Sequence, residues 1–328
     1  MNLHYGRFTA ALVLALAAGA AQSASHTFAA KTYYTTFSGA HPVALTIKPG
    51  DRVSTKTIDA AGADWNGVTV AGRGNPETGP FYIEGAEPGD MLVVHLESIV
   101  PNRATAFSGS LLAPYTVDPI TIAERVDREP KRVIWLIDRD KGQARLEDTS
   151  IQAGNIELPL NPMLGCIGVA PDRKQAIATN TPGNFGGNMD YAGVIAGATV
   201  MLPVFEPGAL LFIGDGHARQ GQGELVGSGL ETSMDVQFSV ELVKQKTLAW
   251  PRLENETHIM VLGSARPLGE ALQHANSELQ RWLMADYGYS ERGAQLLMGQ
   301  AAELEIANVV DPNFTAVAKI RKSLLVKH

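Results

Sequence analysis

Three copies of one turn-forming segment constrain this chain to a fold rich in β-strands. Each contains a Pro-Gly pair, and the three are Lys48-Pro49-Gly50-Asp51, Glu87-Pro88-Gly89-Asp90 and Glu206-Pro207-Gly208-Ala209. Proline presets φ at the first central turn position and glycine supplies a positive φ at the second, so each segment predicts a type II turn. Each is followed by a strand-like run, and the 33 glycines and 18 prolines are spread along all 328 residues. This distribution indicates turns between many short strands.

Alternating hydrophobicity identifies two of these strands. Leu92, Val94 and Leu96 occupy every second position after the second turn, and residues 235–242 show the same period of two. Because successive side chains of a strand point to opposite faces, both runs predict strands with one apolar face. We therefore expect residues 25–265 to form a mainly β domain, an antiparallel sandwich or barrel-like assembly that carries the site.

Helical periodicity appears only near the C-terminus. Apolar residues recur at spacings of three and four at Leu268, Leu272, Ala275, Leu279 and Leu283, which predicts one apolar helix face. A second helix is expected from Ser290 to about Ala307, and the residues from Phe314 onward are ambiguous between strand and helix. Residues 266–328 are thus expected to be a helical segment that packs on the β domain.

The first 24 residues are predicted to be a secretory signal peptide. Arg7 provides a short positive region, residues 8–21 are apolar, and Ala21-Gln22-Ser23 places small residues where a signal peptidase cleaves. The apolar run is too short for an ordinary membrane span. A retained anchor is the alternative, but we expect a periplasmic or secreted protein.

Charge and cysteine content exclude some classes of function. The net charge is −7 with no long basic run, which argues against nucleic acid as a partner. Cys166 is the single cysteine, so no intramolecular disulfide forms. A nucleophilic thiolate needs a nearby base, and the neighbours of Cys166 are apolar. We therefore expect a small core residue rather than a catalytic one.

The densest group of metal-ligand side chains lies in residues 215–224. An apolar strand leads into a glycine-rich loop that carries Asp215, His217 and Glu224. On an extended backbone, Asp215 and His217 point to the same side, and Glu224 can return across the turn as a third ligand. One imidazole with two carboxylates suits Zn²⁺ when one position stays open to water. The alternative is a capped turn with a solvated histidine.

Residues 180–191 form a second polar and glycine-rich loop. Such a loop leaves backbone N–H groups outside a regular ladder, where they can stabilise a developing oxyanion. The expected donors are Gly186, Gly187 and Asn188, and Asp190 is a candidate ligand or base. The alternative is an ordinary tight connection. Asp59 and Glu84 also lie where extended runs meet glycine-rich turns, so either carboxylate is placed to reach a central site or to remain solvated.

Three blocks together resemble the acetamidase/formamidase family. They are residues 79–90, residues 180–190, and residues 215–224 followed by Gly229-Leu230-Glu231, and they occur in the family's order. The resemblance implies an antiparallel β fold, a homo-oligomer of two or more subunits, and hydrolysis of formamide, acetamide or similar short amides. It also implies a divalent metal, zinc or calcium, in at least some members.

The resemblance assigns the family's polar cluster to particular positions of this chain. These positions are Asp59, Glu84, Asp190, Asp215, His217 and Glu224, while Glu231 matches a less specific part of the pattern. Two departures matter. Gln222 stands where many relatives have aspartate, which predicts a weaker or different cation. The signal peptide also differs from cytosolic members of the family.

These observations together predict a metal-dependent hydrolase that releases ammonia and a carboxylate from short amides. The expected metal ligands are Asp215, His217 and Asp59, and the expected catalytic carboxylates are Glu84, Glu224 and Asp190. Zn²⁺ is the expected ion and Ca²⁺ the second choice. The expected partner is a small amide, with no stable membrane insertion after signal cleavage. The alternative is an exported, non-catalytic β module that holds structural Ca²⁺ and binds a small solute.

Overall fold

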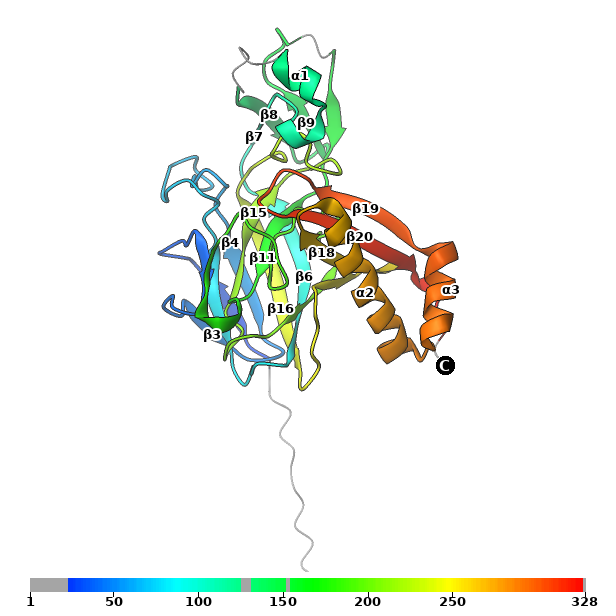
Figure 1. Cartoon of the computed structure of the whole chain (residues 1–328). Helices are drawn as coiled ribbons and strands as arrows, with labels where there is room; N and C mark the ends of the chain where they lie inside the picture. The colour runs from blue at the N-terminus through cyan, green and yellow to red at the C-terminus, as the bar shows by residue number, and fades with distance from the viewer. Residues whose placement is uncertain (1–22, 125–130, 152–153, 327–328) are drawn as a thin grey trace, which may run out of the picture.

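The computed structural model describes residues 23–124, 131–151 and 154–326. Residues 1–22 of the expected signal peptide lie outside the described residues. Strands form the body of the molecule, a small lobe projects from one end, and two helices lie along one side (Figure 1). None of the helices in the described ranges is long and apolar enough to cross a membrane.

The largest sheet has nine strands. In order across the sheet they are β1 (Ser25–Phe28), β4 (Arg52–Lys56), β16 (Met234–Val243), β6 (Met91–Pro101), β14 (Thr199–Pro203), β17 (Arg252–Glu254), β18 (His258–Ala265), β20 (Phe314–Arg321) and β19 (Glu303–Asn308). Neighbouring strands are antiparallel except β1 and β4. The long pair β6 and β16 sets Val94 opposite Val240, both facing the core.

A second sheet of five strands carries much of the site. In order they are β13 (Gly186–Asn188), β11 (Met163–Gly168), β15 (Leu211–His217), β5 (Thr78–Ile83) and β3 (Leu45–Ile47). Only the pair β3 and β5 is parallel. A separate two-stranded sheet joins β12 (Ala176–Ala178) to β2 (Thr36–Ser38). Two short 3₁₀ helices complete the body, η2 (Asp172–Lys174) and η3 (Lys322–Leu324).

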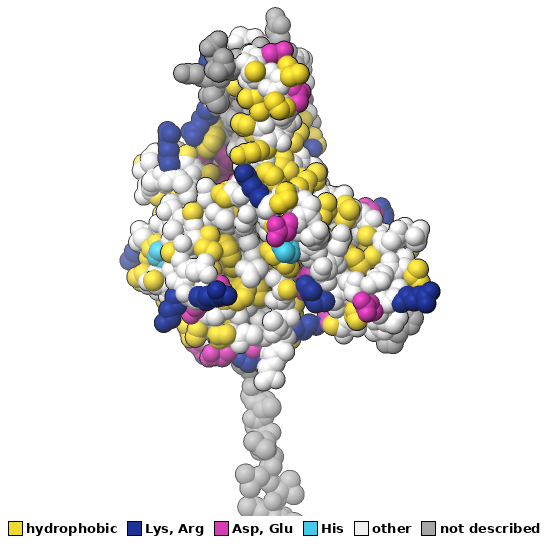
Figure 2. Space-filling model, viewed as in Figure 1, with side chains coloured by type: hydrophobic (Ala, Val, Ile, Leu, Met, Phe, Trp, Pro, Cys, Tyr) yellow, Lys and Arg dark blue, Asp and Glu magenta, His cyan; other side chains and the backbone are white. Residues whose placement is uncertain are grey.

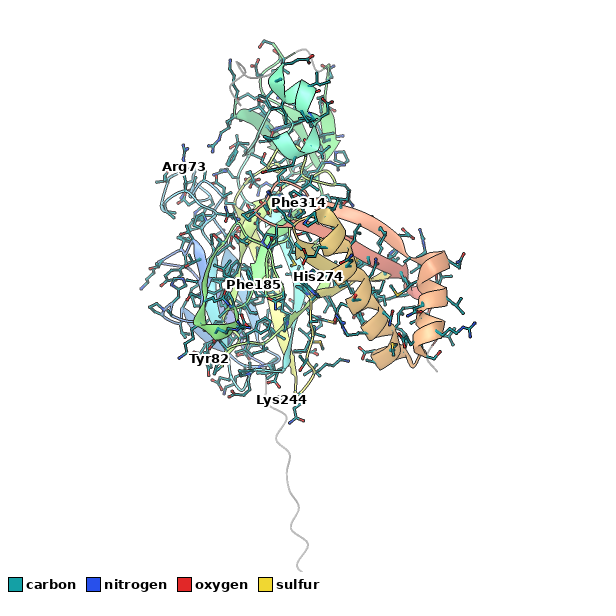
Figure 3. All side chains as sticks on the ribbon, in the orientation of Figure 1. Arg73, Tyr82, Phe185, Lys244, His274 and Phe314 are labelled. Atoms are coloured by element: carbon teal, nitrogen blue, oxygen red, sulfur yellow. The ribbon has the colours of Figure 1, made fainter. Side chains whose placement is uncertain are left out.

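The main hydrophobic core lies between the nine-stranded and five-stranded sheets. The Phe81 ring of β5 meets the Phe238 ring of β16 edge to face, with centroids 5.2 Å apart. Phe185, labelled in Figure 3, packs against Phe37 in the same core. Leu92, Val94 and Leu96 are buried in this core, as their alternation predicts. The predicted sandwich is therefore confirmed, and the described sheets do not close into a barrel.

The three Pro-Gly segments form the predicted turns. Gly50, Gly89 and Gly208 have φ values of 92°, 93° and 79°. In each turn, the residue after the glycine donates its backbone N–H to the carbonyl of the residue before the proline. The local sequence therefore determines these turns.

Helix α2 (Leu268–Tyr287) packs against the face of the nine-stranded sheet opposite the main core, beside α3 (Glu291–Ala301) (Figure 1). Ala275, Leu279 and Leu283 are fully buried there, which confirms the predicted helix face. The α3 helix begins after its N-cap Ser290 but ends at Ala301, earlier than expected. The following residues pair as β19 and β20 instead, so the segment after residue 265 contains two strands of the main sheet as well as helices.

The projecting lobe is a four-stranded antiparallel sheet with two short helices. Its strands in order are β10 (Glu157–Pro159), β9 (Gln143–Leu146), β8 (Val133–Asp138) and β7 (Thr105–Ser108), and its helices are η1 (Pro114–Thr116) and α1 (Pro119–Ala123). Tyr115 of η1 packs on Phe314 of β20, with ring centroids 5.8 Å apart, and the Arg266 guanidinium lies 4.4 Å from both rings. Phe314 is labelled at this junction in Figure 3.

Candidate active site

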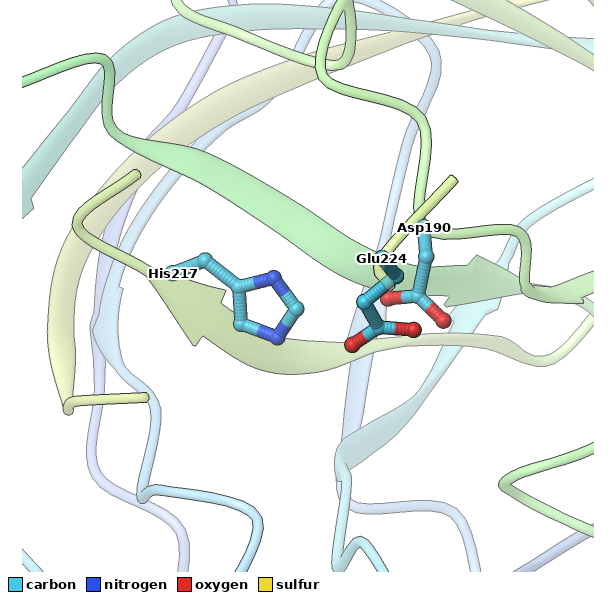
Figure 4. Close-up of side chains that lie close together, drawn as sticks. All are labelled: Asp190, His217 and Glu224. Carbon is cyan, nitrogen blue, oxygen red and sulfur yellow. The ribbon is translucent and has the colours of Figure 1, made fainter. Parts of the chain in front are cut away.

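His217, the last residue of β15, lies at the centre of a buried group of carboxylates. Its Nε2 atom is 3.0 Å from Glu231 Oε1 and 3.4 Å from Asp215 Oδ1. The imidazole is fully buried. Asp190 and Glu224 also lie beside the imidazole, with their carboxylates close together (Figure 4).

Two sets of three side chains share His217. One set is Asp190, His217 and Glu224, the other is Asp215, His217 and Glu231, and in each set the potential ligand atoms lie within 4.8 Å of one another. All five residues are buried. One imidazole therefore lies in contact range of four carboxylates: Asp215 on the same strand, Glu224 and Glu231 in the residues that follow, and Asp190 from a separate loop.

Several polar atoms of this cluster have no hydrogen-bond partner among the described residues. They are His217 Nε2, Asp190 Oδ1, Glu231 Oε2, and both carboxylate oxygens of Glu77. A buried polar group without a partner costs about 1–3 kcal/mol, and more when charged. Such a concentration of unsatisfied donors and acceptors is typical of a site that binds a cation or a polar ligand.

The backbone of the site adopts conformations that ordinary residues rarely adopt. Asp190, Asp215 and Glu224 have φ values of 45°, 50° and 51°, in the left-handed region. Non-glycine residues in this region are uncommon and cluster at functional sites. Close approach also matters, because a Cβ atom on Gly165 would lie 2.3 Å from Asp190 Oδ1 and 2.6 Å from Asp215 Oδ2. Only glycine leaves room for both carboxylates at this point of β11.

The imidazole and its nearest carboxylates perturb each other's ionisation. Burial lowers the pKa of His217, but Glu231 and Asp215 raise it more, and the net pKa is well above 6.5. Burial raises the pKa of Asp215, yet His217 lowers it further and the net change is downward. Burial raises the pKa of Glu231 to about 7. Without a cation, the histidine is therefore protonated beside the charged Asp215.

The remaining carboxyl groups favour their protonated forms. Burial and the charge of Glu224 raise the pKa of Asp190 well above 3.8. Burial and Asp311 raise the pKa of Glu224 well above 4.5. Burial and Asp215 raise the pKa of Glu77 well above 4.5. Burial raises the pKa of Asp311 to about 7. Burial and the neighbouring carboxylates therefore make each of these groups harder to ionise.

A layer of amide side chains positions the carboxylates. Asn188 Nδ2 donates to Asp190 Oδ2 at 2.6 Å and to Asp311 Oδ2 at 2.9 Å. Asn75 Nδ2 donates in turn to Asn188 Oδ1 at 2.8 Å. Asp311 comes from the loop between β19 and β20, so the C-terminal segment contributes to the site.

The structure brings together four of the residues expected from the sequence and separates two others. Asp190, Asp215, His217 and Glu224 converge as described above. Glu84 does not join them: its side chain is half exposed in the turn after β5, 3.9 Å from Lys48. Asp59 is buried, but its oxygens accept hydrogen bonds from the N–H groups of Ala61 and Ala63 and from Arg103. Neither residue belongs to the two sets that share His217.

The loop expected to supply oxyanion donors contributes in another way. Gly186, Gly187 and Asn188 form the strand β13, which pairs with β11. The N–H of Gly186 donates to the carbonyl of Gly183 and is not free. What reaches the cluster from this strand is the side chain of Asn188. Gln222, which stands where many relatives have aspartate, is exposed and lies outside both ligand sets.

Sequence reasoning missed Glu77 and Asp311 and gave Glu231 too little weight. Glu77 directly precedes β5, and a Cβ atom on Gly214 would lie 2.2 Å from its Oε2 atom. A sequence signal for Glu77 was present, because it belongs to the same glycine-rich run as Glu84. The two residues flank strand β5, and Glu77 is buried while Glu84 is exposed. The sequence around Asp311 did not indicate a site, because the residue only precedes a proline that ends the expected helix.

Cys166 lies in the core beside this site. Its Sγ atom donates to the carbonyl of Thr179 at 3.4 Å, and the residue is fully buried. Burial, together with Glu77 and Asp215, raises the pKa of the thiol well above 9.0. These surroundings disfavour a thiolate, which agrees with the expected role of Cys166 as a core residue.

Known proteins share this fold over nearly its full length. An acetamidase from Yersinia enterocolitica is 32% identical, with a TM-score of 0.80 over 94% of this chain and 96% of that one. An acetamidase from Bacillus halodurans is 28% identical, with a TM-score of 0.76 over 90% and 97%. A Schizosaccharomyces pombe protein, whose name gives formamidase as an inferred activity, is 26% identical over 260 residues. The match spans 62% of the length of that curated relative.

Fold and site together define a class of protein, a β-sandwich with a buried histidine–carboxylate centre that shares its fold with acetamidases. The family assignment follows from the sequence itself. The model of the acetamidase/formamidase family matches residues 29–176 and 172–325. The chain therefore belongs to the acetamidase/formamidase family.

Proposed function

We propose that this chain hydrolyses short amides to ammonia and a carboxylate, at a divalent metal held around His217. The observation that supports this most is the convergence of one imidazole and four buried carboxylates, several of whose atoms lack partners in the described residues. The acetamidase and formamidase names of similar proteins support the substrate class.

The donor set fits a transition metal. Asp190, His217 and Glu224, or Asp215, His217 and Glu231, would hold the ion, and both sets offer one nitrogen and two carboxylate oxygens. Imidazole nitrogen favours Zn²⁺ over Ca²⁺, which takes six to eight oxygen ligands. When bound, such an ion polarises a carbonyl and lowers the pKa of water towards about 7.

Carboxyl groups of the protein are proposed to carry out the proton transfer. Amide hydrolysis moves a proton from the attacking water to the departing nitrogen. If Asp215, His217 and Glu231 hold the ion, Glu224 is free for this transfer, and it is buried within contact range of His217 and Asp190. Burial and Asp311 raise the pKa of Glu224 well above 4.5. Glu77, buried with both oxygens unpartnered, is the second candidate for donating a proton to the leaving nitrogen.

The amide side chains hold these groups in place. Asn188 donates to Asp190, and Gln220 contacts both His217 and the backbone carbonyl of Asp190. They therefore orient the carboxylate and the imidazole in the absence of substrate.

A metal assay paired with an amide panel tests the proposal. The purified chain is analysed for bound metal, and ammonia release is measured from formamide, acetamide and propionamide before and after chelation. We expect about one metal ion per chain, ammonia release, and loss of activity on chelation that zinc restores. Bound metal with no ammonia from any amide would instead favour the exported, solute-binding module. Full activity in the chelated, metal-free protein would contradict metal dependence.

Export is part of this proposal. Strand β1 begins at Ser25, so removal of residues 1–24 takes away no residue of a described strand, although Ala24 accepts a hydrogen bond from the N–H of Arg52 and donates one to Asp51. This boundary supports cleavage just before the fold begins. N-terminal sequencing of protein recovered from the periplasm of the expressing cell tests it, and an uncleaved N-terminus in that fraction would contradict it.

Self-association is also proposed. Figure 2 shows hydrophobic side chains gathered on the projecting lobe. Among its residues, Tyr115 is 62% and Ile120 is 74% exposed. Apolar side chains grouped on a protruding element are typical of interfaces, and we propose a second copy as the partner. Analytical ultracentrifugation of wild type and Ile120→Asp measures the subunit number, and equal sedimentation of both as monomers would exclude this surface.

A further inference from the structure

Arg266, just after β18, connects the projecting lobe to the body of the molecule. Its exposed guanidinium lies 4.4 Å from the ring centroids of both Tyr115 in the lobe and Phe314 in β20. A guanidinium is attracted to the face of an aromatic ring and stacks on it as a planar group. The two rings therefore determine where the Arg266 side chain lies.

The same guanidinium also contacts a loop of the site. Arg266 Nη2 donates to the backbone carbonyl of Asp311 at 2.6 Å. The Asp311 side chain accepts from Asn188 Nδ2 at 2.9 Å, and this Nδ2 also donates to Asp190 at 2.6 Å. A continuous series of contacts therefore leads from the lobe through Arg266, Asp311 and Asn188 to one of the clustered carboxylates.

Arg266 holds the middle of the loop between β19 and β20. The ends of this loop bond to other loops through the N–H of Val309 and the side chain of Asn313. Between them, the N–H of Asp311 lies 3.5 Å from Asn308 Oδ1, a long hydrogen bond. The bond from Arg266 to the Asp311 carbonyl is shorter and charge-assisted, and such bonds are roughly twice as strong as neutral ones.

Asp311 lies at the solvent side of the cluster. It is partly exposed, whereas Asp190 and His217 are fully buried. A carboxylate at this position turns towards water unless its backbone is held in place. Asn188 would then lose one of its two acceptors, and its hold on Asp190 would weaken.

We propose that Arg266 is a positioning residue, which holds Asp311 against Asn188 and thereby fixes the carboxylate of Asp190. Tyr115 holds the Arg266 guanidinium in turn, so the lobe contributes to the organisation of the site. The consequence for metal binding rests on the proposed function, in which Asp190 is a candidate ligand. The consequence for the loop itself does not.

Substitutions of Arg266 separate its charge from its bulk. Arg266→Met keeps an unbranched side chain but loses the guanidinium, whereas Arg266→Lys keeps a cation that can reach a carbonyl or a ring. Arg132→Met is the matched control, because Arg132 is also exposed and its guanidinium lies 3.7 Å from the Phe107 ring within the lobe. It removes a similar stacking contact at a place with no described link to Asp311.

Zinc affinity, measured in competition with a chromogenic chelator, tests the effect on the site. Groups that orient a metal ligand contribute about 10–100-fold to affinity. Arg266 acts one contact further away, so we expect about a tenfold loss in Arg266→Met, a smaller loss in Arg266→Lys and wild-type affinity in Arg132→Met. Wild-type affinity in Arg266→Met would overturn the proposal.

A double-mutant cycle tests the route through Asp311. If Arg266 acts by holding Asp311, then Arg266→Met should change zinc affinity by less than about twofold in an Asp311→Ala background. Losses that multiply in the double variant would show that Arg266 acts elsewhere, and would overturn this route.

Hydrogen exchange of the metal-free protein tests the loop directly. Peptides covering residues 306–314 should exchange at least about threefold faster in Arg266→Met and Tyr115→Ala than in wild type, because the loop opens more often. Ile120→Asp, exposed on the same lobe, shows whether altered self-association has this effect by itself. Equal exchange in wild type and Arg266→Met would contradict a holding role.

Failure of this inference and failure of the proposed function are distinguishable. No bound zinc and no ammonia from any amide in the wild type would overturn the proposed function. The side-chain amide signal of Asn188, in metal-free protein labelled with ¹⁵N-asparagine, then decides the positioning role. It is identified by its loss in Asn188→Asp. It should shift in Arg266→Met as it does in Asp311→Ala, and an unshifted signal in Arg266→Met would overturn the positioning role.

Discussion

The side-chain amide of Gln220 determines which nitrogen of His217 faces the site. Gln220 Nε2 donates to the backbone carbonyl of Asp190, so its Oε1, 2.8 Å from His217 Nδ1, must accept. His217 Nδ1 therefore carries a hydrogen, and Nε2 faces Asp215 and Glu231. In a neutral imidazole this arrangement leaves the Nε2 lone pair free for a metal ion.

Removing this hydrogen bond is expected to weaken metal binding. Groups that orient a metal-bound histidine typically contribute 10–100-fold to affinity. Gln220→Met keeps the length of the side chain and loses the amide, so we expect a zinc affinity about 10–100-fold lower in competition with a chromogenic chelator. Gln222→Met, an exposed neighbour on the same loop, is the matched control. Equal affinities in the two variants would remove the orienting role of Gln220.

Replacing the imidazole itself is expected to abolish the site. His217→Ala removes the nitrogen that both ligand sets share. We expect less than one tenth of the wild-type metal content and a fall in kcat of at least about 10²-fold, because a bound ion contributes several kcal/mol to stabilising the transition state. The far-UV circular dichroism spectrum should stay that of a β protein. Full turnover by this variant would contradict a centre at His217.

The space that Gly165 leaves for two carboxylates is expected to be as important for activity as the carboxylates themselves. The Cβ of Gly165→Ala would lie 2.3 Å from Asp190 Oδ1, so the carboxylate has to move. Overpacking of this kind costs about 1–3 kcal/mol, and here it acts on a ligand. We expect lower metal content and at least about tenfold lower kcat/KM, because misplaced groups lose catalytic power steeply. Gly72→Ala, where nothing lies within 4 Å of the added atom, should behave as wild type.

Turnover is expected not to depend on the thiol. Cys166 is fully buried, and its pKa is raised well above 9.0 by burial and by Glu77 and Asp215, so almost no thiolate exists at neutral pH. Cys166→Ser should keep kcat within about threefold, and iodoacetamide should not inhibit the wild type. Stoichiometric alkylation that stops ammonia release would restore the covalent hypothesis.

Asp90 is expected to make stability depend on pH in the acid range. Burial raises the pKa of Asp90, but hydrogen bonds from Lys244 and from the N–H groups of Gln245 and Glu87 outweigh it, and the net pKa lies below 3.8. The unfolded chain thus takes up this proton at a higher pH than the folded one. The stabilisation is complete above pH 3.8 and is lost as the pH falls through the lowered value.

Urea unfolding at two pH values measures this contribution. At neutral pH, Asp90→Asn should lower the free energy of unfolding by about 1.5–3 kcal/mol, the range for hydrogen bonds to a charged group. The difference from wild type should shrink towards zero well below pH 3.8. Asp140→Asn, an exposed aspartate of the lobe, should change little at either pH. A difference for Asp90→Asn that does not vary with pH would contradict the sign.

Local sequence determined the features that depend on neighbouring residues. The Pro-Gly turns need only φ preferences, α2 needs only a periodic apolar face, and the strands around Leu92 and Val236 need only alternation. The loop with Asp215, His217 and Glu224 could be predicted for the same reason, because these three residues lie close together in the sequence. The end of α3 was not, since the preference for strand at β19 comes from pairing with β20.

Tertiary structure decided which carboxylates reach the histidine. Glu77 and Glu84 are seven positions apart and look equivalent in the sequence, yet β5 carries one into the core beside β15 and leaves the other half exposed. Asp311 enters the site only because β20 joins the nine-stranded sheet and brings its preceding loop to Asn188. Strand pairing between distant segments sets these distances, and no local preference of the chain encodes them.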